Sequence, residues 1–135
     1  MVFGSVGRGV PGPESDVDCL LVVDPLPDGR IPRVTEFSAV EDTLAHRLDD
    51  LRTKGLFVEL SPVFKTPGEV QRGSPLMLDM VDDALVLFDR DEFFARQMAD
   101  LRERLEALGA RRVWVGNTWY WDLKPDYQPG EIFDI

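Results

Sequence analysis

Two aspartates at the start of an apolar run constrain this chain more than any other feature of its sequence. Asp16 and Asp18 flank a single valine, and residues 17–23 are mostly apolar and β-branched. Such a run, stopped by Asp24-Pro25, predicts a strand. Successive side chains of a strand point to opposite faces, so both carboxylates point the same way. Few structural needs place two acids there, and the pair predicts oxygen ligands for a cation such as Mg²⁺.

A pair of small residues precedes the aspartates. Gly4-Ser5 is separated from Asp16 by ten residues, and the loop at 6–15 contains three glycines and two prolines, which disfavours regular structure. A glycine turn lets the backbone approach a phosphate closely, and its N–H groups can bind the anion. A phosphate cradle beside a cation site is the combination that nucleotidyl transfer requires.

A third acid lies within a second apolar run. Glu59 stands between Val58 and Leu60, in a strand that we expect over residues 56–64. Neighbouring strands lie ~4.8 Å apart, so Glu59 could join the two aspartates around a metal pair if these strands are adjacent. An Asp-x-Asp pair alone is equally typical of a turn and cap. The ordered combination with Gly4-Ser5 and Glu59 favours a functional site.

The rest of the chain alternates between strand and helix patterns. The order predicts an α+β (α/β) fold in which a mixed β-sheet is flanked by helices. The expected elements are strands at 1–3 and 84–88, an amphipathic helix through 37–51 with a capping box at Ser38 and Glu41, short helices after Thr66 and Ser74, and a helix at 94–108 closed by Gly109.

Composition narrows the class of protein. The chain has 135 residues, the size of one domain, and a formal net charge of −10. Because binding to long nucleic acids depends largely on basic groups, bulk RNA or DNA is a poor candidate partner. A small nucleotide accompanied by Mg²⁺ remains compatible. No apolar run suits a membrane span, no signal peptide opens the chain, and a single cysteine fits a cytoplasmic protein.

The C-terminal tail is unusually aromatic. It contains Trp114, Trp119, Tyr120 and Trp121 within eight positions. These rings could stack on a base, but aromatic clusters in tails more often form core or an interface. The tail is therefore compatible with a homodimer.

The Gly-Ser pair, the ten-residue spacer and the Asp-x-Asp motif together resemble the DNA polymerase beta-like nucleotidyltransferase superfamily. The similarity covers roughly residues 1–89 and is greatest to the minimal single-domain branch, which includes the nucleotidyltransferase partners of HEPN-domain toxins. It implies a polymerase beta-like nucleotidyltransferase fold, two Mg²⁺ ions and ATP or another nucleoside triphosphate. We expect a nucleotidyltransferase domain at residues 1–110, with the tail at 111–135 packed on it.

The resemblance also implies roles for individual residues. Asp16, Asp18 and Glu59 would be the catalytic metal ligands, and Gly4 and Ser5 would hold the triphosphate. Arg8, in the loop, is a further candidate for contacting phosphate, although a solvated loop arginine would explain it equally well.

Two functions follow from the resemblance. The first is an enzyme of the EC 2.7.7 type that transfers a nucleotidyl group, AMP from ATP, to a hydroxyl of a protein or small molecule. The alternative is the antitoxin or regulatory module of a toxin–antitoxin pair, with a HEPN-like protein partner and little turnover of its own. Related chains usually carry a helix and a fuller strand before the Gly-Ser pair, whereas three residues precede it here. An upstream start, a shortened chain and a fold without that helix each explain this difference.

Overall fold

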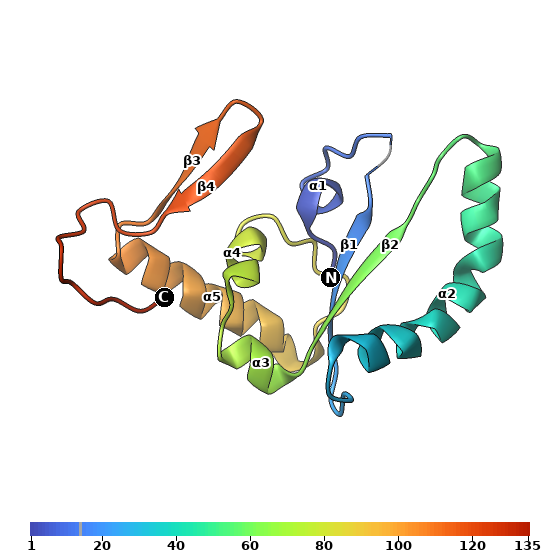
Figure 1. The fold of residues 1–135 in the computed structure, drawn as a ribbon, viewed down its shortest axis with the longest axis horizontal. Coiled ribbons are helices and arrows are strands. Elements are labelled where there is room, and N and C mark those ends of the chain that lie inside the picture. The colour runs from blue at the N-terminus through green and yellow to red at the C-terminus, as the bar shows by residue number, and fades with distance from the viewer. Residues whose placement is uncertain (14) are drawn as a thin grey trace. The chain divides into compact units, whose positions relative to one another are not determined.

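The computed structural model describes residues 1–13 and 15–135 and contains two compact units, Met1–Phe88 and Asp89–Ile135 (Figure 1). Each unit is described separately below. The assignment of residues 1–110 to one nucleotidyltransferase domain stays a prediction.

A small mixed sheet forms the centre of the first unit. Strands β1 (Val17–Val22) and β2 (Leu60–Lys65) run parallel, with Val17 opposite Leu60 and Val22 opposite Lys65. Val2 forms antiparallel bridges to Cys19 of β1 and to Leu85. The expected adjacency of the two strands and the mixed sheet are therefore confirmed. Of the strand predicted at 84–88, only this bridge at Leu85 forms.

The long helix α2 (Arg30–Thr53) begins earlier than the sequence pattern predicts (Figure 1). Its N-cap is Gly29, and Pro32 is accommodated because N–H groups of a first turn have no partner within the helix. The Ser38 hydroxyl donates to the carbonyl of Thr35 inside the helix, so the capping box predicted at Ser38 and Glu41 is wrong. The apolar stripe is only partly covered: Phe37 is buried, while other members of the stripe are half-buried or exposed.

Two short helices follow β2 as predicted. They are α3 (Pro67–Gln71) and α4 (Pro75–Met80), and each has proline in its first turn. Thr66 and Glu69 form a reciprocal capping box at the start of α3. Helix α4 buries Met77, Leu78 and Met80.

The buried apolar side chains around the sheet come from β1 itself and from segments before and after it in the sequence. Leu20, in the middle of β1, is 1% exposed, and Val2 and Phe3 are also buried. Phe37 of α2 makes an edge-to-face contact with Phe64 of β2, with ring centroids 5.8 Å apart. The ring contact packs α2 against β2, and the buried side chains form the core around β1.

The second unit contains one long helix and a hairpin. The 3₁₀ turn η1 (Arg90–Glu92) leads into α5 (Phe93–Ala107), and strands β3 (Arg111–Val115) and β4 (Thr118–Asp122) pair antiparallel. Helix α5 buries residues at the predicted three- and four-residue spacing. The hairpin formed by β3 and β4 was not predicted from the sequence. Within this hairpin the Arg112 guanidinium lies 4.3 Å from the centroid of the Trp119 ring, a cation–π contact. Among the helices of the described residues, none combines the length and apolarity that a membrane crossing requires.

Candidate functional site

The Gly-Ser pair opens a single helical turn, α1 (Gly4–Gly7), rather than a simple loop. Gly4 has φ of +68°, a left-handed conformation that side chains rarely adopt. A Cβ atom added to Gly4 would lie 2.4 Å from Oδ2 of Asp18, well inside van der Waals contact. Glycine is therefore required here both for its backbone conformation and for the close approach to the carboxylate.

Backbone pairing brings α1 to the start of β1. The N–H of Phe3 donates to the carbonyl of Asp18 at 3.0 Å, and the N–H of Leu20 donates to the carbonyl of Met1 at 3.0 Å. A second close approach holds the other end of α1, where a Cβ on Gly7 would lie 2.8 Å from the backbone oxygen of Asp83. The two glycines thus allow α1 to lie directly against its neighbours.

The strand register gathers the three predicted acids at one end of the β1–β2 pair. The N–H of Val17 donates to the carbonyl of Glu59 at 2.8 Å, and Asp18 is paired with Ser61. Asp16 and Glu59 each immediately precede a strand, because β1 begins at Val17 and β2 begins at Leu60 rather than within the predicted range 56–64. Paired residues of parallel strands share a face, so Asp18 and Ser61 lie on one face. We call Asp16, Asp18 and Glu59 the carboxylate end.

The side chains at the carboxylate end are less closely gathered than their backbone positions. Over residues 1–13 and 15–135, no three His, Cys, Asp or Glu side chains form a group that could hold a metal ion. Asp16 and Asp18 interact electrostatically as a pair. Glu59 is exposed, and its role as a third ligand stays a prediction.

The environment of Asp18 disfavours its charged form. Burial, and then the negative charge of Asp16, raise the pKa of the Asp18 carboxyl above its usual range. Hydrogen bonding by the Ser61 hydroxyl and the positive charge of Arg8 act in the opposite direction on the Asp18 pKa. The carboxylate end therefore concentrates negative charge that a cation would relieve.

Arg8 lies close to this charge. It caps the C-terminal end of α1, and its Nη1 atom is 3.7 Å from Oδ2 of Asp83. Its side chain is half-buried, unlike the solvated loop arginine that was the alternative interpretation. Ser5 is half-buried within α1, and its carbonyl accepts the N–H of Val10 at 3.0 Å. Phosphate contacts by Gly4, Ser5 and Arg8 stay predictions.

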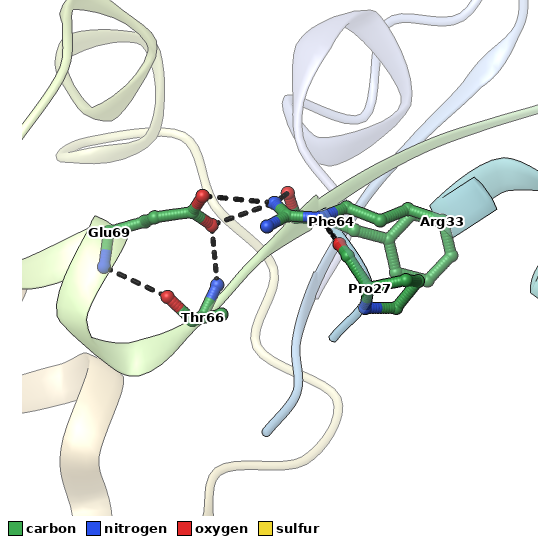
Figure 2. Close-up of polar contacts among 5 residues, drawn as sticks. All are labelled: Pro27, Arg33, Phe64, Thr66 and Glu69. Carbon is green, nitrogen blue, oxygen red and sulfur yellow. Dashed lines mark hydrogen bonds and ion pairs between the residues drawn. The ribbon is translucent and has the colours of Figure 1, made fainter. Parts of the chain in front are cut away.

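A charged cluster that sequence reasoning missed lies at the opposite end of β2 (Figure 2). Arg33 of α2 donates through Nη1 to both carboxylate oxygens of Glu69, at 3.0 and 2.8 Å. Its Nε donates to the carbonyl of Pro27 at 2.7 Å, and Nη1 also approaches the carbonyl of Phe64 at 3.4 Å. We call Arg33, Glu69 and the capping residue Thr66 the arginine cluster.

The arginine cluster holds its carboxylate in the charged form. Hydrogen bonds from Arg33 and from the backbone N–H of Thr66 lower the pKa of Glu69 to about 2. The capping-box spacing of Thr66 and Glu69 marks half of this cluster in the sequence. Nothing local marks Arg33, which is 36 residues away from Glu69.

Comparison with known proteins supplies the family. Residues 1–71 match the family model described as a nucleotidyltransferase domain. The chain belongs to the nucleotidyltransferase domain family. The matched stretch contains all six predicted site residues as well as both strands of the parallel pair. No curated protein and no solved structure matches the chain. Membership of this family supports nucleotidyl transfer as the general activity of the chain, and it implies that a nucleoside triphosphate is a substrate.

Proposed function

We propose that this chain is a Mg²⁺-dependent enzyme that transfers AMP from ATP to a hydroxyl group of a protein or small molecule. The observation that carries the proposal is the contact between Gly4 and Asp18. The Asp18 carboxylate occupies the space that any side chain at the first residue of α1 would need. A helical turn of the kind that can face phosphates thus directly adjoins an acidic pair.

The residues present suit a hard divalent cation. Asp16 and Asp18 would supply carboxylate oxygens, the ligands that Mg²⁺ prefers. The proposal adds Glu59, whose carbonyl accepts the N–H of Val17 between these two aspartates. The raised pKa of Asp18 reflects negative charge and burial that a cation would offset. When bound, two Mg²⁺ ions would orient the α-phosphate and neutralise charge on its oxygens.

The chain's own residues would do the remaining work. Gly4 would let the backbone approach the β- and γ-phosphates, with the Ser5 hydroxyl and the Arg8 guanidinium binding their oxygens. Glu59 would accept the proton of the attacking hydroxyl. That oxygen bonds to the α-phosphorus, the bond from the α-phosphorus to the bridging oxygen breaks, and pyrophosphate leaves.

The acceptor is proposed to be a protein or small molecule because the chain carries a net charge of −10. A long polyanion would be repelled by this charge. A cytoplasmic location is proposed from the single cysteine.

Transfer of labelled nucleotide tests this proposal. The purified chain is incubated with α-labelled ATP, Mg²⁺ and extract of its native cells, and the labelled product is separated by size. We expect label on a protein or a small molecule with the wild-type chain and none with Asp16→Asn. Equal labelling by a folded Asp16→Asn variant would overturn the assignment.

A second candidate is an antitoxin module that acts by binding a HEPN-like protein. The observation that favours it is exposed apolar surface on α2 and the segment after it: Val40 is 44%, Leu56 51% and Phe57 60% exposed. Growth rescue on co-expression with a HEPN-like protein encoded beside this gene separates the two functions. Growth rescue by the Asp16→Asn variant that is as strong as rescue by the wild-type chain would assign the protection to binding alone. A homodimer of the chain would be detected separately, by light scattering.

A further inference from the structure

Ser61 lies directly opposite one of the proposed metal ligands. The register of the parallel pair matches it with Asp18, one position after Val17 is matched with Leu60. Paired residues of parallel strands project to the same face, so Ser61 belongs to the face that carries Asp18. Its side chain is half-buried there.

Strand formation does not explain a serine at this position. Val63 and Phe64 are typical strand residues, whereas serine contributes little to strand propensity or to apolar burial. The Ser61 hydroxyl instead forms a hydrogen bond with the Asp18 side chain, its partner in the strand register. A hydroxyl that faces a carboxylate across two paired strands can hold it in one orientation.

Gly4 leaves room for Asp18 at the start of α1. A Cβ atom at Gly4 would overlap Oδ2 of Asp18, so only glycine at this position lets the carboxylate keep its place beside α1. Asp18 thus lies beside the first residue of α1 and hydrogen-bonds the hydroxyl on β2.

We propose that Ser61 is a positioning residue, whose hydroxyl orients the Asp18 carboxylate for divalent-cation binding. This role rests on the proposed function, because it requires Asp18 to be a metal ligand. Groups that hydrogen-bond to metal ligands typically change metal affinity by 10–100-fold when they are removed. We expect Ser61→Ala to weaken cation binding by about 10-fold.

Mn²⁺ binding measured by electron paramagnetic resonance on the full chain, without nucleotide, tests the role. Ser61→Thr keeps a hydroxyl and should bind within about 2-fold of wild type. Ser38→Ala is the matched control, because the Ser38 hydroxyl donates within α2 to the carbonyl of Thr35. It should bind Mn²⁺ like the wild-type chain, and thermal melting verifies that each variant is folded.

The outcomes separate this proposal from the function on which it rests. Weaker binding by Ser61→Ala, with recovery in Ser61→Thr, supports the positioning role. Unchanged binding by Ser61→Ala, when Asp16→Asn loses Mn²⁺, overturns the role of Ser61 and leaves the proposed function standing. If Asp16→Asn also binds Mn²⁺ normally, the metal site of the proposed function is itself wrong.

Discussion

The two ends of the β1–β2 pair shift the pKa values of their carboxyl groups in opposite directions. At the arginine cluster, Glu69 receives hydrogen bonds from Arg33 and from the N–H of Thr66, and its pKa falls to about 2. At the carboxylate end, burial and like charge raise the pKa of Asp18. Within the part of the chain that the structure describes, no basic side chain forms an ion pair with Asp16 or Glu59.

This difference in pKa distinguishes Glu69, whose carboxylate stabilises the fold, from the carboxylates that could bind a cation or take part in a reaction. A carboxylate whose hydrogen bonds are satisfied stabilises the strand and helices that it joins. Carboxylates placed together without a cation cost stability, and such an arrangement is typical of binding and catalytic sites. Substitutions at the two ends should therefore have opposite effects on stability and activity.

The largest effect is expected for Asp18→Asn. Transfer should fall by at least about 1000-fold, because a ligand worth several kcal/mol of charge stabilisation is removed. The folded-state pKa of Asp18 is raised, so its ionised form weakens the fold at neutral pH and the neutral amide should preserve or raise the melting temperature. Label transfer and thermal melting at pH 7 measure both. A large loss of melting temperature would mean that Asp18 supports the fold as Glu69 does.

Gly4→Ala should have the next largest effect. Its φ of +68° and the 2.4 Å approach to Oδ2 of Asp18 mean that the new methyl group must displace the carboxylate. We expect transfer to decrease by about 100-fold, since small displacements of reacting groups have effects of that order. Gly73→Ala is the matched control, because Gly73 has φ of +75° with nothing within 4 Å of an added Cβ.

Both alanine variants should lose about 1–2 kcal/mol of stability from the left-handed backbone. Only Gly4→Ala should lose activity beyond its loss of folded protein. Equal activities of the two variants at matched folded concentration would show that the contact with Asp18 does not matter.

Glu69→Gln should lower the melting temperature, with transfer per folded molecule nearly unchanged. The pKa of Glu69 is about 2 in the folded chain against an ordinary value of 4.5. Its stabilisation is therefore fully present above pH 4.5 and is lost as the pH falls toward 2. Melting measured from pH 7 to pH 2 should show the wild-type and variant curves converging.

The smallest effect is expected for Asp49→Asn, the control for that variant. Asp49 forms an ion pair with Arg52 in which both side chains are more than 60% exposed. Exposed pairs of this kind contribute little, so the melting temperature should scarcely change. If the melting temperature of Asp49→Asn fell as far as that of Glu69→Gln, the hydrogen bonds of the arginine cluster would contribute no more to stability than an exposed ion pair.

The strands beside the carboxylate end were predictable because their signal is local. The apolar runs predicted β1 and β2, although β2 begins at Leu60 and leaves Glu59 just before it. Thr66 and Glu69 marked the start of α3 in the same way.

The remainder depends on contacts between distant residues. The bond from Arg33 to Glu69 joins residues 36 positions apart in the sequence, and no spacing rule encodes it. The start of α2 was missed because Pro32 resembles a turn residue when its place in a helical first turn is unknown. The hairpin was missed because its aromatic residues are equally typical of a protein core, an interface and a strand.

The most direct measurement compares transfer from α-labelled ATP by the wild-type chain, Asp16→Asn and Glu69→Gln at equal concentrations of folded protein. The carboxylate end should be required for transfer and the arginine cluster only for folding. We therefore expect no transfer by Asp16→Asn and nearly wild-type transfer by Glu69→Gln. Undiminished transfer by Asp16→Asn would contradict the assignment of chemistry to the carboxylate end.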